Sequence, residues 1–68
     1  MIEFKLKSEF IELHKLLKLA GLCESGGMAK QAIAAGVVTV NGAVETRKAF
    51  KVRPSHKIEY DSQTINVL

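Results

Sequence analysis

Apolar and charged residues alternate over residues 1–7 of the chain. Ile2, Phe4 and Leu6 are apolar, and a charged residue stands between each pair of them. A period of two is typical of a half-buried β-strand, because successive side chains point to opposite faces of a sheet. We therefore predict an N-terminal strand, for which pairing with a C-terminal hairpin is one arrangement.

The spacing then becomes that of a helix. Apolar residues recur on one helical face at Leu13, Leu16, Leu17 and Ala20. Ser8 has the side chain of a helix N-cap, and Gly21 has the conformational freedom that ends a helix. The pattern predicts a first helix between these two residues.

A second helical segment follows. Ser25, or Glu24 before it, can supply the N-cap, and Gly36 can supply the C-terminal stop. The stripe predicted to be buried consists of Met28, Ala29, Ala32 and Ile33. Because alanine side chains are small, this helix can pack close to its neighbours.

The C-terminal half has the signals of β-hairpins. Residues 37–40 are mostly valine, and Asn41-Gly42 follows them. A type I′ hairpin turn favours this dipeptide because both of its central residues have positive φ. Ala43 and Val44 begin the return strand.

Two more strands are predicted near the C-terminus. They contain Ile58 with Tyr60 and Ile65 with Val67, and residues 61–63 form the turn between them. Two helices and several short strands predict an α+β fold, with a two-helix motif packed on a small, mainly antiparallel sheet that includes a β-hairpin.

Length and composition bound the class of protein. No repeat or linker interrupts residues 1–68, so we expect one domain, and an apolar fraction of 47% favours a folded core. The single cysteine, Cys23, excludes an internal disulfide and fits a reducing cytosol. No stretch reaches the roughly 20 apolar residues of a membrane span, and because residues 1–5 lack a basic lead followed by a long apolar run, we do not expect export. We expect a cytoplasmic monomer without cofactor or metal.

Positive charge is concentrated in one stretch. The net charge is +3, and five of the ten Lys and Arg residues lie between residues 47 and 57, at Arg47, Lys48, Lys51, Arg53 and Lys57. The run through Arg53 is expected to loop outward, with Phe50 and Val52 as apolar anchors, before a turn at residues 54–56. Such a field attracts a polyanion, for which RNA is the best candidate; a merely solvated basic loop is the alternative.

The start of the second helix is one candidate phosphate site. Ser25, Gly26 and Gly27 leave backbone N–H groups accessible at the positive end of the helix dipole. Lys30, one turn later, would add a positive charge. In the alternative interpretation, the glycine pair only opens the helix.

The basic loop is the other candidate site. Arg47 could hold a phosphate through two parallel hydrogen bonds, and Lys48 could add a point charge. The remaining cations of the predicted interface are Lys15, Lys18, Lys51 and Arg53. We expect Arg47 and Lys48 to converge in space with the opening amides of the second helix.

Exposed aromatic side chains are expected to be scarce. Phe4, Phe10 and Phe50 are predicted to belong to the core rather than to stack on bases. Recognition should then rest on backbone shape and charge, which suits folded RNA better than an extended single strand.

The helix–helix–hairpin order resembles the S-four RNA-binding domain, which is named after the fourth protein of the small ribosomal subunit. The similar segments are Leu13–Leu17, Ser25, Ala29-Lys30, Ile33 and Gly36–Gly42, within about residues 10–60. Residues 24–26, 29–30 and 42–48 are most similar to the small stand-alone YbcJ-type members. The resemblance implies an αL-type RNA-binding motif that binds structured RNA, often ribosomal or transfer RNA.

The chain departs from the family pattern in two places. Ser25-Gly26 stands where the family commonly has Ser-Arg, which removes a usual phosphate contact. Ser55-His56 stands where the family favours Gly-Asp, which affects the tightness of the turn before the late strand.

Other function classes stay open beside RNA binding. Cys23 and His14 are reactive groups, but no base with an orienting partner, phosphate loop or Cys-x-x-Cys pair accompanies them, so we do not expect an enzyme. A DNA-binding helix pair is disfavoured because only Lys30 and Gln31 are long and polar in the second helix. A protein-interaction adaptor that docks on a ribosome or an RNA-processing complex remains an alternative.

Overall fold

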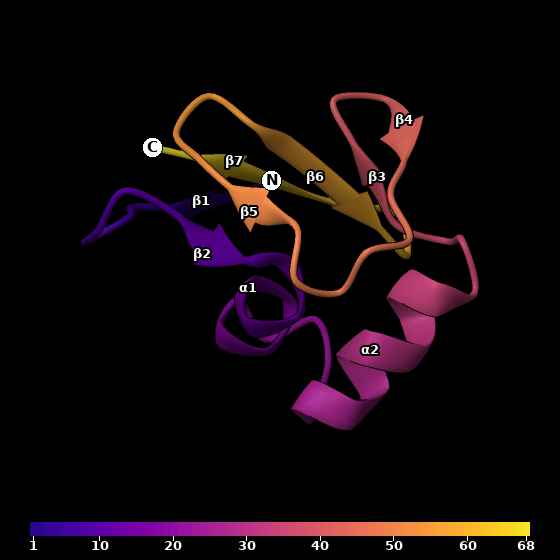
Figure 1. Cartoon of the computed structure of the whole chain (residues 1–68). Helices are drawn as coiled ribbons and strands as arrows, with labels where there is room; N and C mark the ends of the chain where they lie inside the picture. The colour runs from indigo at the N-terminus through magenta and orange to yellow at the C-terminus, as the bar shows by residue number, and fades with distance from the viewer.

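The computed structural model describes residues 1–68, with a helix pair lying against strands (Figure 1). The five-stranded sheet has the order β1 (Ile2–Phe4), β7 (Gln63–Val67), β6 (Lys57–Tyr60), β3 (Thr39–Val40) and β4 (Ala43–Val44). A separate ladder joins β2 (Ile11–Glu12) to β5 (Lys51–Val52). The helices are α1 (Leu13–Leu19) and α2 (Gly26–Ala34). The predicted α+β class, with its helix pair, hairpin and mainly antiparallel sheet, is confirmed.

The N-terminal strand pairs with the C-terminal hairpin, which is the arrangement named in the sequence analysis. β1 runs parallel to β7, with Ile2 opposite Ile65 and Phe4 opposite Val67, and all other pairs are antiparallel. The pairing continues past β1, because the Leu6 N–H donates to the Leu68 carbonyl at 3.0 Å. The two ends of the chain are therefore joined in one sheet.

One core lies between the helices and the strands. Its members are Leu13, Leu16, Leu17, Cys23, Ala29, Ile33, Val38, Val40, Val52, Ile58, Ile65 and Val67. Met28, which was predicted to be buried, is 46% exposed. Ala29 and Ile33 lie four residues apart on the buried line of α2, and Met28 falls beside that line. Neither helix is long and apolar enough to cross a lipid bilayer.

The first helix begins later than predicted. Ser8 is not its N-cap; the Ser8 hydroxyl donates to the Phe10 carbonyl at 2.9 Å. Residues 11 and 12 instead form β2, so the helix starts at Leu13 after Glu12, whose side chain makes no capping hydrogen bond. The prediction failed because a strand partner distant in sequence, β5, holds the segment extended.

The second helix begins as predicted. Ser25 has extended backbone angles, and its hydroxyl oxygen accepts a hydrogen bond from the Met28 N–H at 3.1 Å. This satisfies one of the four N–H groups that every helix leaves without an intrahelical partner. Ala35 is the C-cap, and Gly36 follows with a φ of +77°.

The Asn41-Gly42 hairpin turn is confirmed. The φ angles of these residues are 51° and 86°, and both are positive as a type I′ turn requires. The Asn41 side chain also accepts a hydrogen bond from the Lys57 N–H at 2.8 Å, which ties the turn to the start of β6. The hairpin and its neighbouring strand are thus locked together at this end of the sheet.

The basic run does not simply loop outward. Lys51 and Val52 form β5, where Val52 pairs with Ile11 of β2 and is fully buried. Phe50 is half-buried and packs against the core. The two predicted anchors are therefore confirmed, and between them they hold the run against the body of the protein.

The turn after β5 contains a residue in an unfavourable conformation. Ser55 has a φ of +79°, and the His56 N–H closes the turn by donating to the Arg53 carbonyl at 3.2 Å. This is the position where the S-four pattern favours glycine. Since a side chain with a Cβ is strained at positive φ, Ser55 costs stability that glycine would not.

We predict that Ser55→Gly stabilises the protein by about 0.5–1 kcal/mol, the relief of left-handed strain less the added freedom of the unfolded glycine. Urea denaturation of the wild type and the variant measures the difference. Ser8→Gly is the matched control, because Ser8 does not have positive φ. The explanation is wrong if Ser55→Gly lowers the free energy of unfolding as Ser8→Gly does.

Candidate nucleic-acid interface

The segment between β4 and β5, residues 45–50, is called the basic loop here, and its backbone is hydrogen-bonded to the first turn of α1. The Leu13 N–H donates to the Phe50 carbonyl at 2.9 Å, and the His14 N–H donates to the Lys48 carbonyl at 3.1 Å. Within the loop, the Phe50 N–H donates to the Arg47 carbonyl at 3.2 Å. Two helix amides thus receive partners without a side-chain cap, and the loop's cationic side chains start from fixed backbone positions.

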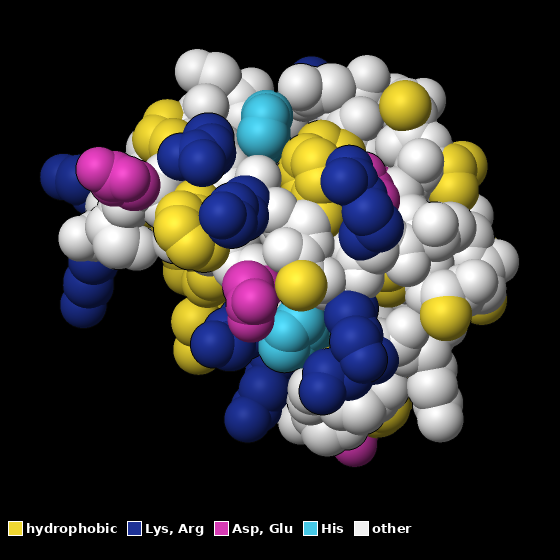
Figure 2. All heavy atoms as spheres, viewed as in Figure 1, with side chains coloured by type: hydrophobic (Ala, Val, Ile, Leu, Met, Phe, Trp, Pro, Cys, Tyr) yellow, Lys and Arg dark blue, Asp and Glu magenta, His cyan; other side chains and the backbone are white.

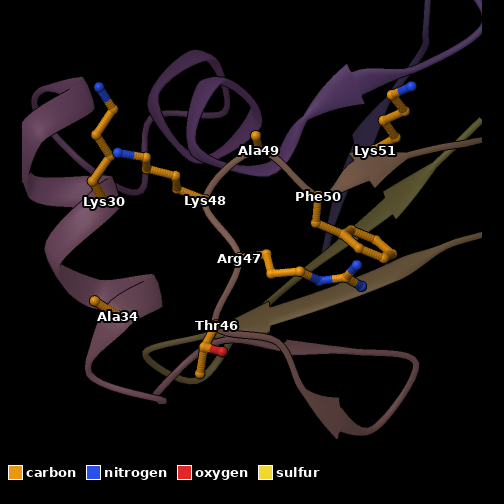
Figure 3. Close-up of a pocket in the computed structure, with 8 residues that line it drawn as sticks. All are labelled: Lys30, Ala34, Thr46, Arg47, Lys48, Ala49, Phe50 and Lys51. Carbon is orange, nitrogen blue, oxygen red and sulfur yellow. The ribbon is translucent and has the colours of Figure 1, made fainter.

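A shallow groove separates this loop from α2. It is lined by Lys30, Ala34, Thr46, Arg47, Lys48, Ala49, Phe50 and Lys51. In Figure 3, the Lys48 side chain extends from the loop toward Lys30 on α2, and Ala34 leaves space one turn further along the helix. The structure therefore brings four of the predicted cationic residues to one groove, from segments that are well separated in the sequence.

Most cations of this face have no carboxylate partner. The only ion pairs in the chain are His14–Glu12, Lys15–Glu12 and Arg47–Glu45. Lys30 and Lys48 are exposed and unpaired, as are Lys51 and Arg53. Figure 2 shows Lys and Arg side chains gathered over this side of the molecule, so the field here is positive.

Arg47 differs from the lysines because Glu45 holds it. The Glu45 carboxylate accepts hydrogen bonds from Arg47 Nε at 2.9 Å, from Nη2 at 3.0 Å and from the Arg47 backbone N–H at 3.0 Å. The Arg47 side-chain hydrogen bond is the main reason why the pKa of Glu45 is lowered to about 2. The same pair raises the pKa of Arg47. One edge of the guanidinium, predicted to grip a phosphate, is occupied by a carboxylate of the chain itself.

Phe10 is not part of the core, contrary to the sequence prediction. It is half-buried, and Lys51 Nζ lies 5.0 Å and Arg53 Cζ 5.5 Å from its ring centroid. Phe10 was expected on the first helix. Because the chain stays extended through β2 and α1 begins only at Leu13, Phe10 lies before the helix. Its ring therefore attracts two of the predicted cations, Lys51 and Arg53, because a positive charge is attracted to an aromatic face.

Five of the other predicted residues do not line the groove: Lys15, Lys18, Ser25, Gly26 and Gly27. Lys15 is 3.4 Å from Glu12 and lines a separate hollow with Phe10. Lys18 lies exposed in the last turn of α1 and lines none of the three hollows of the surface. Ser25 caps α2, and the N–H groups of Gly26 and Gly27 have no hydrogen-bond partner within the chain.

The sequence did not predict the contacts that three residues of this surface make with its cations. Glu45 was counted only as a charge, and Phe50 and Phe10 only as apolar residues. The signal for the Glu45–Arg47 pair was their spacing of two, which puts both side chains on one side of an extended segment. No local signal pairs Phe10 with Lys51 or Arg53, since these contacts depend on the β2–β5 ladder.

Cys23 and the two histidines of the chain, His14 and His56, are buried or hydrogen-bonded within the fold. Cys23 is 3% exposed, and burial raises the pKa of its thiol, which disfavours the nucleophilic thiolate. His14 Nε2 lies 3.2 Å from a Glu12 carboxylate oxygen, and His56 Nδ1 accepts a hydrogen bond from the Arg53 N–H at 2.9 Å. No group of three His, Cys, Asp or Glu side chains is arranged to hold a metal ion.

Comparison with known proteins gives a family and several relatives. The S4 domain family matches residues 4–68. The chain is 45% identical over 62 residues to the "Putative RNA-binding protein YbcJ" of Escherichia coli (strain K12), with 91% of this chain and 89% of that protein covered. The "Uncharacterized protein YbcJ" of Shigella flexneri matches to the same extent.

Two solved structures resemble this one. The solution structure of E. coli YbcJ, described as having an αL motif involved in RNA binding, superposes with a TM-score of 0.77 over 100% of this chain and 87% of that chain, at 45% identity. The crystal structure of the 30S ribosomal protein S4e from Thermoplasma acidophilum has a TM-score of 0.63 over 85% of this chain and 31% of that chain. At 24% identity, the second likeness concerns the fold alone.

The Glu45–Arg47 pair gives a prediction about acid. Because the folded pKa of Glu45 is depressed, the pair stabilises the protein above the ordinary pKa of 4.5 and loses this effect as the pH falls to about 2. Arg47→Ala should move the pKa of Glu45 from about 2 back toward 4.5, as measured by an NMR titration of the carboxyl carbon. Arg53→Ala, the control, should leave it low; an equally low pKa in Arg47→Ala would refute the assignment.

Proposed function

The chain belongs to the S4 domain family, and on this premise we propose that it binds structured RNA of the ribosomal or transfer RNA class through the sugar–phosphate backbone. The observation that carries the proposal is the groove between α2 and the basic loop. There, Lys30 and Lys48 approach from two elements, and neither has a carboxylate partner. Two unpaired ammonium groups across an open groove are suited to the phosphates of a polyanion.

The other unpaired cations extend this site into a track. Lys51 lines the groove, and Arg53 lies beside it over the Phe10 ring. At the other end, the N–H groups of Gly26 and Gly27 lie at the positive end of the α2 dipole, one turn before Lys30. We assign phosphate contacts to these positions, and a smaller part to Lys15, whose charge is shared with Glu12, and to Lys18, which lies outside the hollows.

The shape of the site favours folded RNA over duplex DNA. Reading DNA bases in a major groove requires a helix with several long polar side chains, and α2 has only Lys30 and Gln31. A rigid loop set against a helix instead suits backbone contacts, which dominate the recognition of folded RNA helices. Competition between a structured RNA and duplex DNA at one salt concentration tests this preference.

A protein-interaction adaptor is the second candidate, and a separate surface favours it. A hollow beside β1 is lined by four apolar residues and four polar ones: Phe4, Leu6, Ile11, Leu19, Glu3, Lys5, Lys7 and Ser8. It shares no residue with the basic groove. Leu19 is 65% exposed. An adaptor that docks on a ribosome or an RNA-processing complex would use this surface for an acidic segment with apolar residues, because Lys5 and Lys7 outweigh Glu3 and give its rim a net positive charge.

Salt dependence is the first test of the RNA proposal. If the four unpaired cations Lys30, Lys48, Lys51 and Arg53 each contact a phosphate, log Kd should change with log salt with a slope of roughly 3 to 4 in magnitude, at about 0.7–0.9 per phosphate. Titration of a transfer RNA or a ribosomal RNA hairpin at several salt concentrations measures the slope. A slope near zero would contradict phosphate contacts.

A charge-matched pair of variants locates the site. Lys30→Ala with Lys48→Ala should weaken RNA binding and reduce the salt slope by about 1.4–1.8, since two phosphate contacts are lost. Lys5→Ala with Lys7→Ala removes the same amount of charge from the hollow beside β1. This double variant should leave the salt slope nearly unchanged. Equal losses in both double variants would mean that net charge, rather than this groove, drives binding.

A further inference from the structure

Arg47 lines the same groove as the lysines but is electrostatically unlike them. Its Nε and Nη2 groups and its backbone N–H all donate to the Glu45 carboxylate at 2.9–3.0 Å. The pair as a whole is neutral, and Glu45 adds a negative charge that a phosphate would have to approach. Phosphate affinity is therefore better served by Lys30 and Lys48, which have no such partner.

The guanidinium of Arg47 also lies over the ring of Phe50. Its Cζ atom lies 5.2 Å from the centroid of the Phe50 ring, and the ring of His56 lies 5.8 Å on from Phe50 at an interplanar angle of 34°. Phe50 packs against the core, and both its N–H and its carbonyl are hydrogen-bonded. The planar group is thus held by a carboxylate at one edge and by an aromatic ring on one side.

The opposite side of Arg47 is accessible to a ligand. Its side chain is 73% exposed, whereas the Glu45 side chain that holds it is 14% exposed. In Figure 3, Arg47 extends toward Phe50, and Lys48, the next residue, extends in the other direction toward Lys30. Two consecutive residues therefore present a flat cation on one side of the groove and a point charge on the other.

We propose that the Arg47 guanidinium, held between Glu45 and Phe50, is a stacking platform for one unpaired nucleobase of the RNA, while Lys30 and Lys48 bind the adjacent phosphates. Guanidinium planes stack on unstacked bases in RNA loops, bulges and ends, and a fixed plane loses little side-chain freedom on binding. The inference rests on the proposed RNA binding and deepens it. It specifies a helix interrupted by, or ending at, an unpaired base, rather than continuous duplex.

The competing arrangement is that Arg47 leaves Glu45 and binds a phosphate. In that case, Arg47 would respond to charge and be indifferent to the presence of a base. A stacked Arg47 would instead depend on the planarity of its side chain, which lysine lacks at the same charge. Arg47→Lys therefore separates the two arrangements.

The test uses three RNA hairpins that share one stem: fully paired, with a single 2-aminopurine bulge, and with an abasic bulge. The wild type should bind the 2-aminopurine hairpin about tenfold more tightly than the other two, a typical effect of stacking one base on a protein side chain. The fluorescence of 2-aminopurine should change on binding as the base stacks. Arg47→Lys should lose this preference and the fluorescence change, while its affinity for the paired hairpin stays within about twofold of wild type.

Lys48→Ala is the matched control. It should weaken binding of all three hairpins alike and lower the salt slope, because it removes a phosphate contact and leaves Arg47 in place. The stacking proposal is overturned if the three hairpins bind equally, or if Arg47→Lys keeps the preference for the 2-aminopurine bulge. These outcomes would leave the proposed function intact, whereas the absence of any salt-dependent RNA binding would refute both.

Discussion

Two backbone hydrogen bonds join the basic loop to the first turn of α1, and the rest of the surface depends on them. The N–H groups of Leu13 and His14 donate to the carbonyls of Phe50 and Lys48. Each such bond contributes about 1 kcal/mol net, and leaving a buried donor without a partner costs more. The two hydrogen bonds supply partners for the first amides of the helix, and they also fix the position of the loop. It places the loop's cations beside α2 and opens the groove in which they meet Lys30.

Carboxylates divide the positive residues into two kinds. Glu12 neutralises part of the charge of Lys15, and Glu45 holds Arg47 at one edge. Lys30 and Lys48 have no such partner, although they lie on the same face. Because phosphate affinity comes from charge that an anion can approach, the count of basic residues overstates the size of the phosphate site. The paired Arg47 is the residue whose shape, rather than its charge, suits a nucleobase.

Local signals predicted elements and failed where a distant partner intervened. Asn41-Gly42 and Ser25 behave as expected, since turn and cap preferences act within a few residues. Ser8 did not cap α1, because residues 11 and 12 pair with β5 some forty residues later. The same ladder takes Phe10 out of the core and brings Lys51 and Arg53 to its ring. The family resemblance captured the helix pair and hairpin, which are local in sequence, but not the contacts of the loop.

The sequence by itself determined the α+β class, the capped second helix, the hairpin and the identity of the candidate cations, because periodicity, turn chemistry and charge are written in neighbouring residues. Only the tertiary structure decided which cations share a groove, which are neutralised and which lie over aromatic rings. These properties depend on distances between side chains from α2, the loop after β4 and the segment before β2. Such distances follow from packing and from the two ladders, and no short stretch of sequence encodes them.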